Sequence, residues 1–365
     1  MATKKIVKTI EQEIKKINDK KNKILFFVAD TKGKPSGSLL YIYETVYQLK
    51  ELGYNVGILH VEQDFVGVES WLGKKYADLP HFNIEHDSVS VSPSDILIIP
   101  DFCGNVMAET KALPCKRIVL IQNFSNLTRT MPMGATFSDL KIRECITTTQ
   151  SLSNEIKKFF PNLEIKTVQP SISDEFFKDV PEAKSLIINI VANDSSIVNS
   201  LIKPFYWKYP NYNWVAFRQL NNLSREEFRN ALKEGVATIW VDDNTDFGYS
   251  VLEAMACKNL IIGKIPDRMP DWLLDSEGKI KDNGIWFYNT SAGPDAIASV
   301  VSVFMDEKVP NVVLRNMEET VKPYSGEEQK KEIETVYQEI LNERKKELEI
   351  ALTVEKNNNE ENESK

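Results

Sequence analysis

The chain contains 365 residues, 42% hydrophobic and 27% charged, which is the composition of a globular protein long enough for two domains. Its net charge of −8 disfavours binding to nucleic acid, because phosphate recognition needs a positive surface. The 4 cysteines (Cys103, Cys115, Cys145 and Cys257) share no C-x-x-C spacing and the chain has only 3 histidines, so neither a metal site nor a disulfide framework is expected.

Residues 1–22 are predicted to form a charged N-terminal helix. The helix mixes lysines with Glu11, Glu13 and Asp19, which favours a solvated helix over one that lies on a membrane surface. The segment lacks the apolar stretch of a secretory signal, and no run of about 18 apolar residues could span a bilayer. We therefore expect a cytoplasmic protein without a transmembrane segment.

The first half of the chain alternates short apolar runs with segments of helical periodicity. Strands are predicted at residues 23–30, 55–61, 95–102, 117–124, 144–150 and 164–172. Helices are predicted at 39–53, 104–112 and 151–160. Ser151 or Ser153 is a candidate N-cap for the last of these helices. The alternation indicates a parallel sheet covered on both faces, in which ligands bind beyond the carboxyl ends of the strands.

The same alternation recurs in the second half. Strands are predicted at residues 186–194, 213–220, 236–243, 258–265 and 284–290, with helices at 195–210 and 224–235. Ser224 and Glu227 have the spacing of a capping box. A long charged helix is predicted near the end, and its apolar residues Ile333, Val336 and Ile340 would permit packing across both domains or assembly.

Two such halves joined by a linker place a cleft between two sets of strand ends, which suits group transfer between two bound molecules. A dehydrogenase is disfavoured because no G-x-G-x-x-G fingerprint follows any predicted strand. A P-loop ATPase or kinase is disfavoured because the Walker A pattern is absent.

Residues 236–263, "VATIWVDDNTDFGYSVLEAMACKNLIIG", resemble the signature of retaining glycosyltransferases of the GT-B fold, in particular family four. The weaker similarities of "SGSLLYIYETVYQLKELGYNVGILH" and "CITTTQSLSNEIKKFFPNLEIKTVQPSISDEFF" follow the order of that family. The resemblance implies an α/β protein with two doubly wound Rossmann-like domains facing a central cleft. It also implies metal-independent transfer of a sugar from a nucleotide-sugar donor, with UDP or GDP as the nucleotide, retention of configuration and no further cofactor.

This interpretation divides the chain into six segments. They are the N-terminal helix (1–22), an acceptor-side domain (23–172), a linker (173–185), a nucleotide-sugar-binding domain (186–325), a charged helix (326–355) and a disordered tail (356–365).

The resemblance assigns donor-binding roles around the signature. In the family the second Glu of an E-x7-E motif binds the ribose hydroxyls, and Glu253 holds that position. A carboxylate can accept two charge-assisted hydrogen bonds from a vicinal diol. The turn Phe247, Gly248, Tyr249 and Ser250 precedes a helix, whose first N–H groups attract a diphosphate. The alternative interpretation of Glu253 is a solvated first-turn Glu favoured by the helix dipole.

Candidate residues of the first domain follow its predicted strands. Ser36, Gly37 and Ser38 form the loop expected near the donor phosphates and the acceptor. Gln122 and Asn123 end a strand where family members often carry a His near the transferred sugar, and Asn123 is the candidate catalytic residue. An ordinary capped loop and a polar turn are the alternative interpretations of these two segments.

The signature departs from the family at the positions that carry charge. The first Glu of E-x7-E is replaced by Thr245, a second candidate catalytic residue. The family's Arg and Lys that clamp the diphosphate are missing, and Lys203 is the nearest base in the aligned segment. Arg218 falls where the family contacts the nucleobase, and Lys264 and Arg268 lie near the predicted cleft.

Three functions therefore stay open. The first is a retaining glycosyltransferase with a glycan, lipid-linked or protein acceptor. The second is a degenerate homologue that binds a nucleotide or a glycan without transfer. The third is a glucosyltransferase that modifies DNA, against which the acidic composition counts.

Overall fold

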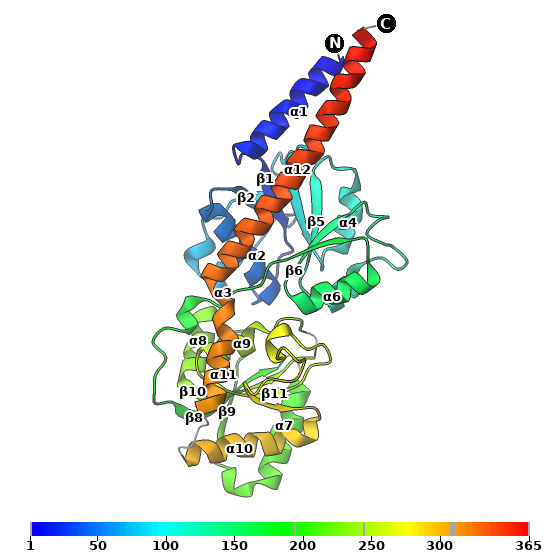
Figure 1. Ribbon diagram of the computed structural model, residues 1–365. Coiled ribbons are helices and arrows are strands. Elements are labelled where there is room, and N and C mark those ends of the chain that lie inside the picture. Colours follow the sequence, from blue (N-terminus) through cyan, green and yellow to red (C-terminus); the bar gives the residue numbers. More distant parts are fainter. Residues whose placement is uncertain (1, 193–194, 244, 307–310, 364–365) are drawn as a thin grey trace.

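The computed structural model describes residues 2–192, 195–243, 245–306 and 311–363. Two α/β domains lie end to end, and a two-helix extension projects from the first domain and carries both chain ends (Figure 1). Each domain is built on one parallel sheet, so the expectation of two doubly wound domains is confirmed.

The first sheet has seven strands in the order β3-β2-β1-β4-β5-β6-β7, all of them parallel. Its strands are β1 (Lys23–Phe27), β2 (Asn55–His60), β3 (His81–Asn83), β4 (Ile96–Pro100), β5 (Lys116–Ile121), β6 (Glu144–Thr147) and β7 (Glu164–Thr167). The edge strand β3 has only three residues, too few for a recognisable pattern, and was not predicted.

Short helices connect these strands. They are α2 (Gly37–Glu51), α3 (Glu69–Leu72), α4 (Gly104–Glu109), α5 (Phe124–Thr130) and α6 (Gln150–Phe159). The predicted N-cap of α6 was wrong: neither Ser151 nor Ser153 caps this helix. Thr149 does, because its hydroxyl accepts a hydrogen bond of 3.2 Å from the N–H of Leu152.

The second sheet has five parallel strands in the order β12-β11-β10-β8-β9. They are β8 (Ser185–Ala192), β9 (Ala216–Gln219), β10 (Gly235–Val241), β11 (Leu260–Lys264) and β12 (Ile285–Phe287). Its helices are α7 (Ser195–Lys208), α8 (Arg225–Glu234), α9 (Tyr249–Ala256), α10 (Gly293–Met305) and α11 (Asn311–Val321). The capping box of Ser224 and Glu227 at the start of α8 is confirmed.

The final helix α12 (Gly326–Glu363) returns to the first domain and runs beside α1 (Ala2–Asn18) (Figure 1). Its residues Ile333, Val336 and Ile340 are buried in the core of the first domain, so these three residues pack within that domain and not across both. The prediction of disorder for 356–365 was wrong as far as Glu363, because α12 continues to that residue. Lys356 pairs with Glu11 of α1 at 2.9 Å.

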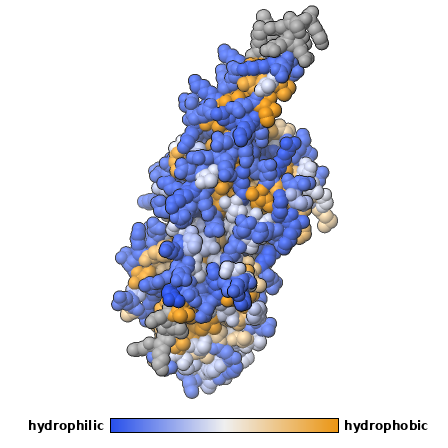
Figure 2. Space-filling view, in the orientation of Figure 1, coloured by the Kyte–Doolittle hydropathy of each residue, from blue (hydrophilic) through white to orange (hydrophobic). Residues whose placement is uncertain are grey.

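The chain crosses between the domains at two adjacent points. Ile172 donates a backbone hydrogen bond of 2.7 Å to Tyr324, so the path into the second domain lies beside the path out of it. Phe176, within the predicted linker 173–185, is buried in the core of the second domain. The visible surface is largely hydrophilic with scattered apolar spots (Figure 2), and no helix in the described part of the chain is long and apolar enough to span a membrane.

Candidate active site in the interdomain cleft

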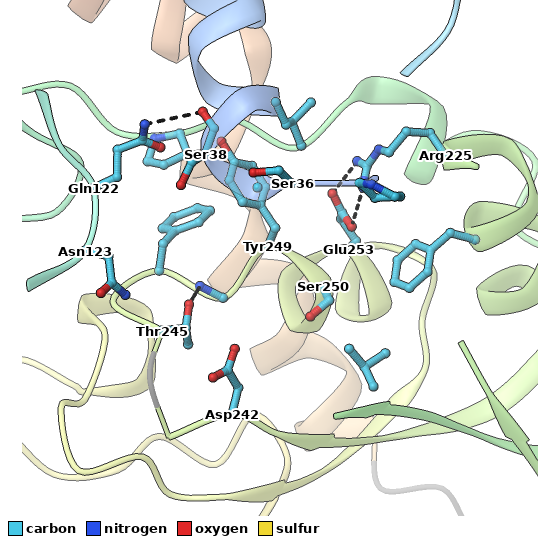
Figure 3. A pocket seen from close by; sticks show the side chains of 18 of the residues that line it. Ser36, Ser38, Gln122, Asn123, Arg225, Asp242, Thr245, Tyr249, Ser250 and Glu253 are labelled. Carbon is cyan, nitrogen blue, oxygen red and sulfur yellow. Dashed lines mark hydrogen bonds and ion pairs between the residues drawn. The ribbon is translucent and has the colours of Figure 1, made fainter. Parts of the chain in front are cut away.

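A cavity of about 460 Å³ lies between the two domains, at the carboxyl ends of their strands. Ser36 and Ser38 at the start of α2 form one wall, and Thr245, Ser250 and Glu253 of the second domain lie across from them (Figure 3). Nearly all the predicted site residues line this cavity: Ser36, Gly37, Ser38, Gln122, Asn123, Thr245, Phe247, Gly248, Tyr249, Ser250 and Glu253.

Two helix N-termini meet at the cavity. Ser36 caps α2, since its hydroxyl accepts from the N–H of Leu39 at 3.4 Å. Gly248 precedes α9 at φ +80° and offers no side-chain cap, so the first N–H groups of α9 have no partner within the helix. A Cβ on Gly37 would lie 3.3 Å from the ring of Tyr249, so glycine allows the two helix ends to approach closely.

Thr245 and Asn123 both contribute to the local structure of the cleft. The Thr245 hydroxyl accepts a hydrogen bond of 3.0 Å from the N–H of Gly248 and thereby holds the turn before α9. Asn123 caps α5 by accepting 3.1 Å from the N–H of Asn126. Both side chains border the cavity, so each combines a capping contact with access to a bound ligand.

Asp101 supports the turn that presents Asn123. It follows β4, is fully buried, and accepts hydrogen bonds of 2.7 Å from the N–H groups of Gln122 and Asn123. Burial raises the pKa of the Asp101 carboxyl to about 7, the two backbone hydrogen bonds oppose the shift, and the charge of Asp246 adds to it. Asp101 was not predicted from the sequence.

The buried carboxylate of Glu253 already has a partner. Arg225, the first residue of α8, donates from one guanidinium nitrogen to Glu253 Oε2 at 3.0 Å and from another to Oε1 (Figure 3). The Glu253 side chain is 1% exposed. Burial raises the pKa of the Glu253 carboxyl, and the Arg225 guanidinium opposes this shift. Arg225 was missed because it contacts a residue 28 positions away and belongs to no pattern that includes Glu253.

The other candidate cations do not line the cavity and are engaged by other side chains. Arg218 does not line the cavity: it donates to Asn189 at 3.0 Å and to Glu234, and so ties β9 to α8 and β8. Lys264 pairs with Asp243 at 2.6 Å. Arg268 pairs with Asp246 at 2.7 Å and also donates to Ser125 across the domain boundary at 2.7 Å.

Comparison with solved structures decides the architecture. The structure superposes on sucrose-phosphate synthase from Thermosynechococcus elongatus with a TM-score of 0.61 and 9% identity, covering 88% of this chain and 99% of that one. A glycosyltransferase from Rickettsia africae gives 0.59 and 15%, covering 88% and 98%. The pneumococcal O-GlcNAc transferase GtfA in complex with UDP and GlcNAc gives 0.60 and 9%, covering 88% and 99%. The chain has the GT-B fold.

No family model and no curated protein sequence matches the chain. The similarity to GT-B proteins therefore rests on three-dimensional structure. At sequence identities of 9–15%, this similarity establishes the fold and not the function. The cavity is lined by more acidic than basic side chains. Among the described residues that line the cavity, Arg225 is the only basic side chain, beside the carboxylates of Asp242, Asp246 and Glu253.

Proposed function

We propose that this GT-B protein transfers a sugar from a nucleotide-sugar donor bound in the interdomain cleft, with retention of configuration. The observation that carries the proposal is the meeting of the α2 and α9 N-termini at one cavity, next to a carboxylate in the position of the family's ribose ligand. Helix N-termini bind phosphate because their first N–H groups have no partner within the helix and the helix dipole is positive there.

The mechanism we propose is positioning with stabilisation of the leaving diphosphate. The N–H groups of Tyr249 and Ser250 open α9, and those of Gly37 and Ser38 open α2 on the facing wall. As the bond to the sugar breaks, negative charge grows on the diphosphate oxygen, and preorganised N–H donors stabilise it. Asn123 and Thr245 line the cavity, and in this mechanism the amide of Asn123 hydrogen-bonds a hydroxyl of the transferred sugar.

Structures of similar fold support a nucleotide donor. The pneumococcal transferase was solved with UDP and GlcNAc, a starch synthase domain with ADP and acarbose, and an Anabaena protein with UDP and glucose. Glycans, lipid-linked sugars and proteins should all be offered as acceptors in the assay.

The experiment is a screen of UDP-, GDP- and ADP-sugars for hydrolysis and for binding by calorimetry. Glu253→Gln removes the charged acceptor for the ribose diol and should weaken binding of the active donor by about tenfold or more. Glu318→Gln is the matched control, because Glu318 is exposed, pairs with Lys258 at the surface and does not line the cavity. If no donor is bound or hydrolysed by the wild-type protein, the proposal is wrong. NMR of the anomeric proton in the first product tests retention.

One observation favours a second function, binding without transfer. The cavity carries three carboxylates and one arginine, and that arginine is paired with Glu253. A diphosphate would meet few cations there, whereas an uncharged glycan would meet hydroxyl and amide groups. A protein of this kind would bind oligosaccharides in the same calorimetric assay and would bind none of the nucleotides.

A further inference from the structure

The carboxylate expected to bind ribose is occupied by a side chain of the same protein. Arg225 engages both oxygens of Glu253, and the Glu253 side chain is 1% exposed. A planar guanidinium that spans both oxygens of a carboxylate uses the same acceptor geometry that a vicinal diol would use. A ribose therefore cannot reach Glu253 in the way the family does while this pair is intact.

Arg225 also borders a second cavity, toward which its side chain could turn. A second interdomain cavity of about 860 Å³ lies beside the first, and Arg225 and Tyr249 line both of them. Two carboxylates also line the second cavity: that of Glu226, which is exposed, and that of Glu44, which already accepts hydrogen bonds from Lys75 at 3.0 Å and from Tyr76. A guanidinium that left Glu253 by side-chain rotation toward this cavity would face these carboxylates and would not be buried without an acceptor.

We propose that Arg225 is a gate on the donor site: it competes with the ribose for Glu253 and moves toward the second cavity when a nucleotide binds. The inference rests on the proposed function, because it concerns the same donor site. Arg225 acts through Glu253 and is a specificity-determining residue. When only a fraction of molecules has the binding-competent arrangement, the apparent affinity falls by that fraction, so removing the competitor should tighten binding.

The test compares ribonucleotides with their 2′-deoxy forms. UDP, GDP and ADP are titrated into the full-length protein by calorimetry, and the tightest is then compared with its 2′-deoxy analogue, which lacks the vicinal diol. In Arg225→Met we expect the ribonucleotide to bind about tenfold more tightly and the 2′-deoxy form to change by less than about twofold. A purely structural role of Arg225 would not alter the discrimination between the two sugars.

Three further variants serve as controls. Arg315→Met makes the same substitution at an exposed residue of α11 that pairs with Glu319 and lines neither cavity, and it should leave both affinities unchanged. Arg225→Met combined with Glu253→Gln removes the acceptor and should abolish the gain. Arg225→Lys keeps the charge but cannot span both carboxylate oxygens, so about threefold tightening is expected even if the methionine variant fails to fold.

The outcomes separate the two proposals. If the wild-type protein binds a nucleotide and Arg225→Met and Arg225→Lys bind it equally or less tightly, the gate is wrong and the proposed function stands. Equal tightening of the ribo and 2′-deoxy forms also overturns the gate, because it shows an effect that does not pass through the diol. If neither wild type nor Arg225→Met binds any of the three nucleotides, the proposed function fails and the gate fails with it.

Discussion

The carboxylate of Asp246 accepts a hydrogen bond of 2.7 Å from the backbone N–H of Phe124, so a side chain of the second domain lies at the first turn of a helix in the first domain. Arg268 pairs with the other oxygen of Asp246 and donates to Ser125. Asp271 repeats the arrangement at α6, where it accepts 2.7 Å and 2.9 Å from the N–H groups of Gln150 and Ser151. These contacts hold the domains together around the cleft.

Asp246→Ala should loosen this closure. The substitution removes the acceptor for Phe124 and leaves Arg268 without its carboxylate, a loss of about 1.5–3 kcal/mol of interdomain contact. We expect a larger radius of gyration by small-angle X-ray scattering and faster proteolysis at the domain crossing. Asp267→Ala, at an exposed position next to Arg268 in the loop after β11, is the control. Identical scattering of Asp246→Ala and wild type would contradict the prediction.

Asp101 should make stability depend on pH. Burial raises the pKa of Asp101 to about 7, whereas the pKa of an aspartate carboxyl in an unfolded chain is about 3.9. Between those values the folded state holds a proton that the unfolded state has released, so the free energy of unfolding falls as pH rises. Raising the pH from 5 to 8 should therefore lower the free energy of unfolding by roughly 2–3 kcal/mol through the ionisation of Asp101. In Asp101→Asn this contribution to the pH dependence should be absent. Urea denaturation of both proteins at several pH values measures it, and parallel curves would overturn the assignment.

Gly248→Ala should destabilise the turn before α9. Gly248 has φ +80°, where a side chain is strained, and a Cβ there would lie 3.2 Å from Val251 and 3.3 Å from Trp240. We expect a loss of about 1–2 kcal/mol from the backbone alone, and more from the contacts. Gly278→Ala is the matched control, because Gly278 has φ +77° with nothing within 4 Å of its Cβ. Thermal unfolding should show a larger fall for Gly248→Ala than for the control.

The sequence predicts the strands of both sheets except β3. A strand buried on both faces is typically an apolar run, and β1, β4 and β5 each contain at least four consecutive apolar residues. The capping box before α8 could be predicted because both of its partners lie within four residues. The N-cap of α6 could not be predicted, because Thr149, Ser151 and Ser153 are all of residue types that cap helices. The sequence alone does not show after which of them the helix begins.

The contacts of the site depend on residues that are distant in sequence. The motif around Glu253 places a carboxylate at the cleft, but only the fold brings Arg225 onto it. Arg218 has the residue type expected of a ligand contact, and the structure instead places it on Asn189 and Glu234, outside the cavity. Local patterns therefore predict which elements border the cleft, and they do not predict which charges are already neutralised there.

Lys116→Met should destabilise the contact of α12 with the first sheet. The Glu144 side chain is 2% exposed and lies 2.6 Å from Lys116 Nζ, which also reaches Glu343 of α12 at 3.4 Å. Removing the lysine leaves a buried carboxylate whose nearest cation among the described residues is Lys166 at 4.0 Å, a cost of about 3 kcal/mol. Chemical denaturation measures the loss. Adding Glu144→Gln should recover most of it, and no recovery would show that the charge is not the cause.

The return of α12 to the first domain has a consequence for how the molecule is made. Tyr337, Ile340 and Leu341 complete the core against the first sheet, yet they follow the whole second domain in the chain. A ribosome therefore releases every residue of the second domain before it releases the helix that the first one needs. The second domain can mature on the nascent chain, whereas the first exposes apolar surface until α12 has emerged, a window in which a chaperone would bind.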